Sequence, residues 1–224
     1  GTCGGGVPNA LHALVSLLDS LHDKRGRVAV DGFYDDVSEL TDEMRAEFAK
    51  KGIDEEKLKR TLELDALYGE EGYTFAERVG ARPTLEINGM YGGFQGEGTK
   101  TVIPCEAHAK ITCRLVSHQD PQDILDKVER HIRKHTPPGA KVSVVQREKG
   151  RPYTIDPSHP LLRQAGDAYE RVYGARPVFT RDGGSIPIVE AFARVLSAPV
   201  VLMGFGLPTE NLDAPNEHFH LENF

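Results

Sequence analysis

Hydrophobic residues recur at helical spacing in four stretches of the chain. In residues 9–23 the apolar side chains share one side of a helix, and these are Leu11, Leu14, Val15, Leu18 and Leu21. Residues 120–135 repeat the pattern behind Asp120, a residue type that favours the position just before a helix. Residues 159–173 and 187–195 are predicted to be helical as well.

Other stretches alternate between apolar and polar residues, which predicts strands. From residue 107 to 115 the odd positions are apolar or small and the even positions are polar, as in a strand with one buried face. Residues 83–90 form a similar strand that can pair with it in an antiparallel sheet. Shorter strands are expected at 27–32 and 140–148. Residues 36–66 interleave acids and bases, which predicts interrupted, mostly solvated helices.

The order of these elements predicts two domains, and the fold class α+β followed by α/β. Residues 1–150 should form a two-layer α+β domain, in which two helices cover one face of an antiparallel sheet. The open face or edge of that sheet can serve as a dimer surface. Residues 151–224 alternate helix and strand, with apolar strands at 177–180 and 198–206, as in part of a mostly parallel sheet. Roughly 70 residues cannot cover both faces of such a sheet, so we expect missing partner sequence.

Composition excludes some classes of function without selecting one. The chain has 224 residues, 39% of them hydrophobic, and a formal net charge of −7, which gives no basic stripe for nucleic acid. No apolar run approaches the roughly 18–20 residues of a membrane span, and no signal-peptide pattern opens the chain. Three cysteines without CxxC spacing predict reduced thiols in the cytoplasm. The Gly-rich start at Gly1 is interpreted as a loop entered from a longer chain.

Two candidate binding positions also have simpler structural explanations. The segment TRDGGSIP places Gly184 and Ser185 before a predicted helix, where free backbone N–H groups favour an anion or a carbonyl oxygen. Taken alone, an ordinary Gly-rich turn with a capping serine explains it better. Arg114 lies on the polar face of its strand, and its guanidinium suits a substrate carboxylate. A solvated sheet face remains the simpler explanation for this residue.

Carboxylates and histidines offer further candidates for metal chemistry. His118 and Asp120 form an HxD triplet, but Asp120 is better explained as the cap of the next helix. The pairs Glu55–Glu56 and Glu70–Glu71 lie in or beside the charged segment, and we interpret both as solvated. The tail NLDAPNEHFHLENF holds side chains of the types that bind zinc, which are Asp213, Glu217, His218 and His220. The residues upstream of this tail do not obviously complete a set of three ligands.

Four motifs in order resemble one family. They are GGGVPNALHALVSLLDSL, GTKTVIPCEAHAKITCRLVSHQDP, RDGGSIP and APNEHFHLENF. The chain resembles the dinuclear-zinc metallopeptidases of the aminoacylase and carboxypeptidase family, within the carnosinase and cytosolic nonspecific dipeptidase branch. In this family a lid, or dimerisation, domain is inserted into a catalytic α/β domain. The resemblance implies that residues 1–150 are the lid without its first strand. Residues 151–224 would be the C-terminal part of the catalytic domain, whose N-terminal half is absent.

The resemblance also implies roles for particular residues. Arg114 resembles the residue that holds the C-terminal carboxylate of the substrate, and Thr101 resembles a lid residue that reaches the active site of the partner subunit. Gly184 and Ser185 resemble substrate-contacting residues beside the zinc pair. The family places a zinc-binding histidine where this chain has Asp213, so Asp213 is the candidate metal ligand.

Other parts of the family's machinery have no counterpart here. His218 and His220 lie beyond the position of the family's ligand and do not match it. No catalytic residue is expected in this chain, because the general-base glutamate would lie upstream.

The function implied for the full-length protein is a cytoplasmic, homodimeric dipeptidase. Two zinc ions, or manganese or cobalt in their place, would activate a water that hydrolyses short peptides. This chain alone should be inactive. Two alternatives stay open: a non-catalytic dimerisation or binding module, and an N-acyl-amino-acid deacylase of the same superfamily.

Overall fold

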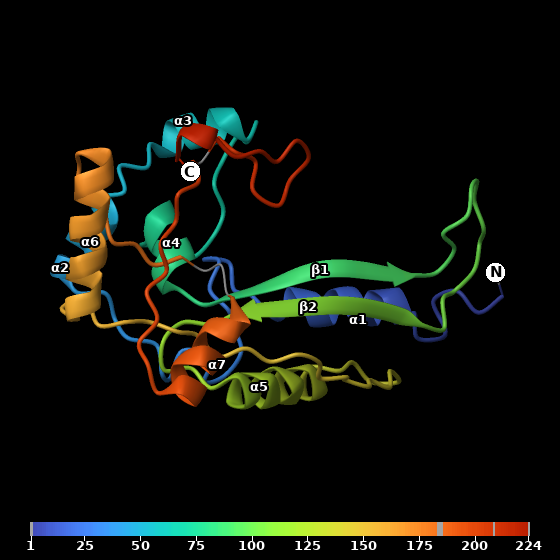
Figure 1. Ribbon diagram of the computed structural model, residues 1–224. Helices are drawn as coiled ribbons and strands as arrows, with labels where there is room; N and C mark the ends of the chain where they lie inside the picture. Colours follow the sequence, from blue (N-terminus) through green and yellow to red (C-terminus); the bar gives the residue numbers. More distant parts are fainter. Residues whose placement is uncertain (1, 183–185, 208, 224) are drawn as a thin grey trace. The chain divides into compact units, whose positions relative to one another are not determined.

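The computed structural model describes residues 2–182, 186–207 and 209–223 (Figure 1). The elements in chain order are α1 (Ala10–Asp19), α2 (Asp42–Ala49), α3 (Glu55–Thr61), α4 (Phe75–Ala81), β1 (Thr84–Gly92), β2 (Ala107–Arg114), α5 (Pro121–Lys134), α6 (Pro160–Tyr173), α7 (Pro187–Leu196) and the 3-10 helix Leu221–Asn223. The chain divides into two compact units. The first unit contains Gly1–Thr154 and Val178–Ala191, and the second contains Ile155–Pro177 and Phe192–Phe224.

The first unit is built on the antiparallel hairpin of β1 and β2. Thr84 lies opposite Arg114 at the base of the hairpin, and Gly92 lies opposite Ala107 at its far end. The main core lies between this hairpin, α1 and α5, and it contains Leu18, Leu21, Val28, Val30, Phe33, Leu85, Ile124 and Val128. Figure 1 shows α1 running behind the hairpin. This arrangement agrees with the predicted two-layer α+β domain.

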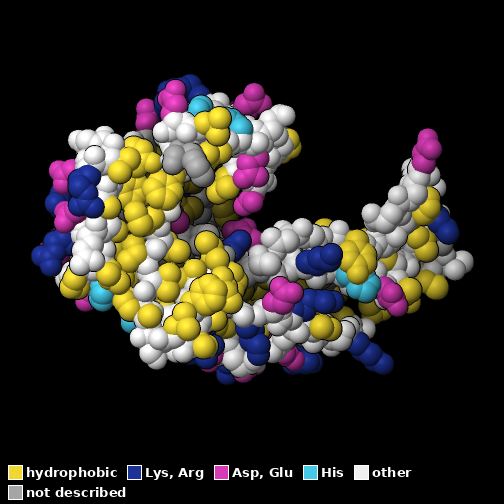
Figure 2. Space-filling view, in the orientation of Figure 1, with side chains coloured by type: hydrophobic (Ala, Val, Ile, Leu, Met, Phe, Trp, Pro, Cys, Tyr) yellow, Lys and Arg dark blue, Asp and Glu magenta, His cyan; other side chains and the backbone are white. Residues whose placement is uncertain are grey.

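A β-bulge in β1 decides which side chains reach each face of the hairpin. The register shifts between Ile87 and Gly89, so that one extra residue is inserted in β1. Side chains alternate with a period of two, and the bulge therefore brings Tyr91 opposite His108 on the outer face. The two rings stack with centroids 4.5 Å apart. Figure 2 shows that basic, hydrophobic and histidine side chains mix on the hairpin surface that faces the viewer.

Both helices of the core layer begin at side-chain caps. The Asn9 carboxamide oxygen accepts hydrogen bonds from the backbone N–H groups of Leu11 and His12, at 2.9 and 3.3 Å. Asp120 caps α5, and Pro121 occupies its first turn, where a missing N–H costs nothing. The burial of Ile124 on α5 follows the predicted apolar stripe. The sequence-predicted helix at 120–135 is therefore confirmed, and the helix predicted at 9–23 forms but ends at Asp19.

A helical segment, residues 42–82, carries α2, α3 and α4. Its small core contains Phe48, Ala76 and Ala81. The helix α4 begins at a capping box, in which the Thr74 hydroxyl accepts from the Glu77 N–H and the Glu77 carboxylate accepts from the Thr74 N–H. The sequence letters TFAE carried this signal, and the prediction of helices overlooked it.

The prediction that Glu70 is solvated is wrong. Glu70 is only 8% exposed and accepts hydrogen bonds from Nε and Nη2 of Arg82, at 2.8 and 2.9 Å, and from Nη1 of Arg27, at 2.9 Å. Its neighbour Glu71 is exposed and pairs with Arg25. The helical segment folds back toward the start of β1, so two adjacent glutamates meet different surroundings. Local sequence pattern does not contain that information.

Four predicted strands do not form in the described residues. At 27–32 only Val28 pairs, in an isolated bridge with His22, and the chain then turns. The ranges 140–148, 177–180 and 198–206 have no strand either. A strand requires a neighbouring strand to pair with, and no described segment pairs with any of these three ranges. The apolar side chains of 198–206 accordingly stay exposed, at 62% for Leu202 and 43% for Phe205.

The second unit contains α6 and the C-terminal tail. The helix α6 ends at Gly174, whose φ of 73° is the left-handed conformation that glycine adopts without steric cost. Tyr169 stacks on Phe205 with ring centroids 5.3 Å apart, and the Tyr173 hydroxyl donates to the carbonyl of Asn223 at 3.0 Å. These contacts hold the tail against α6.

Candidate functional site

Arg114 ends β2, and a buried amide fixes the turn that follows it. The Arg114 side chain is on an exposed position of the outer face. Gln119, only 3% exposed, accepts from the Val116 N–H at 2.9 Å and donates to the carbonyl of Phe33 at 2.8 Å. The turn after Arg114 is therefore anchored to the core. Sequence reasoning missed Gln119, because nothing in its local pattern indicates burial.

The HxD triplet is not a metal site in the described residues. The Asp120 carboxylate accepts from the N–H groups of Gln122 and Asp123, at 2.8 and 3.2 Å, and pairs with Arg151 at 2.7 Å. The backbone N–H of Asp123, followed by that of Gln122 and by the charge of Arg151, holds the pKa of Asp120 below its ordinary value. His118 is exposed. The prediction that Asp120 is a helix cap is confirmed.

Thr101 lies in the exposed loop 93–106 at the far end of the hairpin, away from Arg114 (Figure 1). The loop contacts the start of α1, where the Ala10 N–H donates to the carbonyl of Pro104 at 3.3 Å. From Ala107 to Arg114 the strand alone spans about 23 Å, at about 3.3 Å per residue. Thr101 and Arg114 of one chain are thus separated by most of the hairpin.

Gly184 and Ser185 lie outside the described residues, but the chain just before them is anchored. The Lys51 ammonium donates to the carbonyl of Arg181 at 2.9 Å and to the carboxylate of Asp182 at 2.8 Å. Gly80 of α4 allows this approach, because a Cβ there would lie 2.5 Å from the Arg181 carbonyl oxygen. The helical segment therefore holds residues 181 and 182 in place.

Asp213 lies in an exposed turn of the tail. Its φ is +58°, and Asn211 and Asn216 have φ values of +53° and +63°. The Ala214 N–H donates to the carbonyl of Asn211 at 2.9 Å, and the Glu217 N–H donates to that of Ala214 at 3.2 Å. Left-handed residues other than glycine are uncommon, and three of them within six positions define an unusual, tightly folded loop.

Metal ligands do not gather within the described part of the chain. No group of three or more His, Cys, Asp or Glu side chains there is close enough to hold an ion. The rings of His218 and His220 lie edge to face with centroids 5.4 Å apart, and His218 Nδ1 is 3.0 Å from the carbonyl oxygen of Asn216. A catalytic zinc needs about three protein ligands. The described residues thus offer Asp213 as a single exposed carboxylate and do not complete a metal site.

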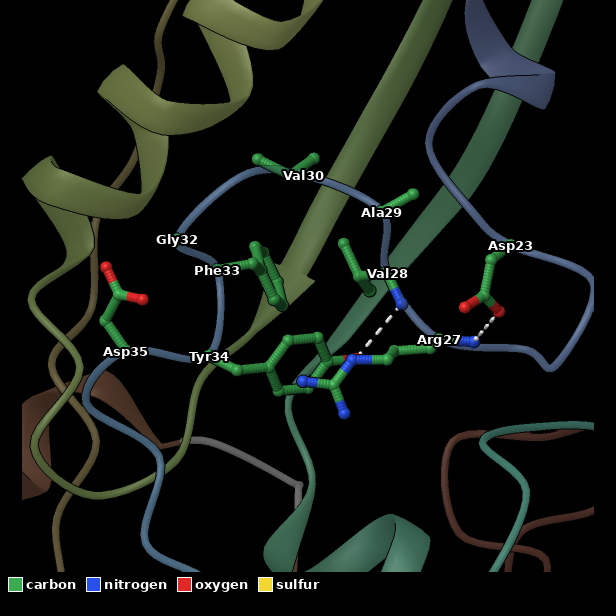
Figure 3. Close-up of a pocket in the computed structure, with 9 residues that line it drawn as sticks. All are labelled: Asp23, Arg27, Val28, Ala29, Val30, Gly32, Phe33, Tyr34 and Asp35. Carbon is green, nitrogen blue, oxygen red and sulfur yellow. Dashed lines mark hydrogen bonds between the residues drawn. The ribbon is translucent and has the colours of Figure 1, made fainter.

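A hollow of about 260 Å³ lies beside the segment 27–35 (Figure 3). The Arg27 guanidinium lies 3.9 Å from the centroid of the Tyr34 ring, and the Tyr34 hydroxyl accepts from the Val28 N–H at 3.0 Å. The Asp23 carboxylate accepts a hydrogen bond from the backbone N–H of Arg27, and this bond is the main reason that the pKa of Asp23 is lowered. The lining residues include no histidine or cysteine. The hollow is lined by Asp23 and by the folded segment 27–35.

Two histidines stack near the end of α5. The rings of His131 and His135 have centroids 3.9 Å apart. The Ser20 hydroxyl donates to the carbonyl of Leu17 at 2.7 Å, so it accepts from Nε2–H of His131 at 3.0 Å. Burial, followed by the charge of His135, lowers the pKa of His131. The pair supports the packing of α5 on α1 and offers no third metal ligand.

A family model described as the peptidase dimerisation domain matches residues 3–140. The chain belongs to this family. The Cys-Gly metallodipeptidase DUG1 of Saccharomyces cerevisiae is 30% identical over 230 residues, which cover 100% of this chain and 47% of that protein. The Beta-Ala-His dipeptidase of Homo sapiens is 29% identical over 227 residues, which cover 100% of this chain and 45% of that protein.

Solved structures also resemble this member of the dimerisation-domain family. The M20 family metallo-carboxypeptidase Sso-CP2 from Sulfolobus solfataricus matches with a TM-score of 0.86 and 30% identity, over 99% of this chain and 51% of that chain. Human carnosine dipeptidase 1 matches with a TM-score of 0.84 and 28% identity, over 100% of this chain and 48% of that chain. The predicted family resemblance and α+β fold are confirmed. The chain spans about half the length of these relatives. Within the described residues, no helix has the length and apolar character to cross a membrane.

Proposed function

We propose that this chain is the dimerisation domain and the C-terminal catalytic part of a metal-dependent dipeptidase. The match to the dimerisation-domain family and the similarity to metallodipeptidases over the whole chain support the proposal. Residues 1–150 would be the dimerisation domain, and 151–224 would belong to the catalytic domain. The location would be the cytoplasm, in keeping with cysteines that are all free in the structure.

In the proposed enzyme Arg114 binds the C-terminal carboxylate of a short peptide. An arginine at the end of a strand, followed by a turn anchored through Gln119, offers a guanidinium on a fixed backbone for a bidentate contact. Gly184 and Ser185 would contact the same substrate. No nucleic acid or membrane is needed as a partner.

The separation of Thr101 from Arg114 carries the proposal of a homodimer. A dipeptide spans about 7 Å when extended, whereas β2 alone spans about 23 Å. One chain therefore cannot bring Thr101 and Arg114 to the same dipeptide while the hairpin stays intact. If both residues act on one substrate, Thr101 comes from a second copy of the chain. An isologous dimer would build two such composite sites.

The metal ions of the proposed enzyme are two zinc ions, with manganese or cobalt as substitutes. Bound to the full-length protein, they would lower the pKa of a water molecule and polarise the peptide carbonyl. Asp213 would supply one ligand, and its exposed carboxylate makes no salt bridge with the described residues. The remaining ligands and the general base would have to come from outside residues 1–224. We therefore assign no catalytic residue to this chain.

Hydrolysis of dipeptides and of their C-terminal amides tests the role of Arg114. The full-length protein should hydrolyse dipeptides in a metal-dependent manner, and the 224-residue chain should not. Arg114→Met should lower kcat/KM for dipeptides about 30- to 100-fold, because a charged hydrogen bond is worth about 2–3 kcal/mol. The same variant should change the amide substrate little. Lys110→Met, on the same face of β2, is the matched control.

Failure can take two forms. Equal losses on the acid and the amide would reject carboxylate binding by Arg114. A full-length protein that hydrolyses N-acyl amino acids but not dipeptides, or that hydrolyses neither, would reject the dipeptidase proposal in favour of the deacylase or the non-catalytic module.

Mixing two inactive variants tests the composite site. A heterodimer of Arg114→Met and Thr101→Val chains contains one site with both residues intact if the site is shared between subunits. Refolding the variants together should then restore about a quarter of the wild-type activity, since half of the dimers are mixed and each has one intact site. A mixture that stays inactive, although mixed dimers form, would reject the shared site.

A further inference from the structure

Glu210 is buried within a tail that is otherwise open to solvent. It is 5% exposed, whereas every other described residue from 202 to 222 is exposed. A carboxylate is seldom buried without partners, because it loses its hydrogen bonds to water. The burial of Glu210 in this setting therefore calls for a specific set of hydrogen bonds.

Backbone groups from both sides of a loop supply these bonds. The two carboxylate oxygens accept from the Leu207 N–H at 2.9 Å and from the His220 N–H at 2.8 Å. The backbone of Glu210 adds two more, because its N–H donates to the carbonyl of Leu207 at 3.1 Å and its carbonyl accepts from the His218 N–H at 3.0 Å. One residue thus joins the beginning and the end of the segment 207–220.

Gly206 completes this arrangement. A Cβ at Gly206 would lie 2.8 Å from Oε2 of Glu210, closer than a carbon and an oxygen normally approach. The glycine therefore leaves room for the carboxylate to reach the Leu207 N–H. The backbone donors, first among them the N–H of His220, lower the pKa of Glu210 and keep it charged.

The loop closed by Glu210 contains the turn of Asp213, with its three left-handed residues. We propose that Glu210 is a positioning residue, which holds residues 211–217 in one conformation and thereby fixes Asp213 for metal binding. The inference rests on the proposed function, in which Asp213 is a metal ligand. We assign Glu210 to the loop rather than to the metal, because it is buried and each of its oxygens accepts from a backbone N–H group of the tail. Groups that orient a ligand typically affect metal affinity about 10- to 100-fold.

Glu210→Gln is the sharpest test, because it keeps the size of the side chain. The single amide oxygen can satisfy one backbone donor, and the new NH₂ group then faces the other. In the metal-free, full-length protein, amides within 207–220 should exchange with solvent at least about 10-fold faster than in wild type. Affinity for Zn²⁺, measured by chelator competition, should fall about 10- to 100-fold. Glu222→Gln, an exposed glutamate of the same tail, should change neither quantity.

Turnover separates positioning from a direct catalytic role. At saturating metal, kcat of Glu210→Gln should return to within about threefold of wild type, because Glu210 contacts no substrate. Unchanged hydrogen exchange of the amides within 207–220 would overturn the proposal that Glu210 holds this loop in one conformation. Faster exchange with unchanged Zn²⁺ affinity would overturn the positioning of a metal ligand. A wild-type protein that binds no Zn²⁺ and hydrolyses no dipeptide would instead reject the proposed function, and this result is independent of the exchange data.

Discussion

Replacing Glu70 with glutamine tests how the helical segment 42–82 is joined to the hairpin core. The Glu70 carboxylate is 8% exposed, and the Arg82 side chain that binds it through two nitrogens is 4% exposed. Arg82 also lies over the rings of Tyr34 and Tyr73, at 4.9 and 4.5 Å from their centroids. Glu70→Gln removes the negative charge and leaves the buried guanidinium without its counter-ion.

The expected loss of stability is about 3 kcal/mol. Removing one partner of a buried ion pair costs about 3–5 kcal/mol, since the other charge stays buried and uncompensated. The lower end applies here, because glutamine keeps one oxygen for Arg82 and the second partner, Arg27, is 47% exposed and stays in contact with water. For a chain of this length, about 3 kcal/mol corresponds to a fall in Tm of about 6–12 °C.

The adjacent residue provides the control. Glu71→Gln makes the same chemical change in an exposed pair with Arg25, and its unfolding midpoint in urea should match that of wild type. Urea unfolding followed by circular dichroism measures both variants under the same conditions. If Glu70→Gln and Glu71→Gln unfold at the same urea concentration, the hydrogen bonds of Glu70 to Arg82 and Arg27 do not hold the helical segment to the core.

Three further predictions concern other parts of the first unit. Burial raises the pKa of Cys113 to about 12, so with a thiol reagent at pH 8 the two exposed cysteines should react at once and Cys113 only after denaturation. The lowered pKa of His131 means that its side chain binds a proton more readily in the unfolded state than in the folded state. The urea midpoint should therefore fall as the pH drops below about 6.5. His131→Gln should make this fall smaller, whereas His12→Gln should not. Gly80→Ala should destabilise the chain by about 1–3 kcal/mol despite the better helix propensity of alanine, because its methyl group would meet both the carbonyl of Arg181 and the ring of Phe48. An unchanged or raised Tm would contradict this close packing.

The spacing of apolar residues predicted helices and strands correctly where the structure of a segment depends on that segment alone. The stripe of α5 and the cap at Asp120 follow from neighbours within one turn, and β2 alternates along its whole length. Strands failed where pairing depends on other segments. Residues 198–206 are as apolar as a buried strand, yet no described segment pairs with them, and a strand is a property of two segments.

In the candidate site, too, the sequence indicated some residues and missed those that act through distant partners. Resemblance named Arg114, Thr101 and Asp213 as site residues, and their roles remain predictions. The residues that shape their surroundings, Gln119 and Glu210, were not predicted, because each acts through backbone groups distant in the sequence or across a loop. A polar residue that stabilises a turn leaves no periodic signal. Such residues become visible only when the partners of every buried polar side chain are followed.

The bulge in β1 links the fold to the proposed dimer. Without the extra residue between Ile87 and Gly89, the side chains beyond it would exchange faces, and Tyr91 would point toward α1. With it, the outer face carries Tyr91 and His108 beside Lys110 and Arg114, a mixed surface without a continuous hydrophobic patch (Figure 2). Burial of such a face in a dimer would gain little from the hydrophobic effect and much from matched charges. A contact made through this face should therefore weaken as salt is raised.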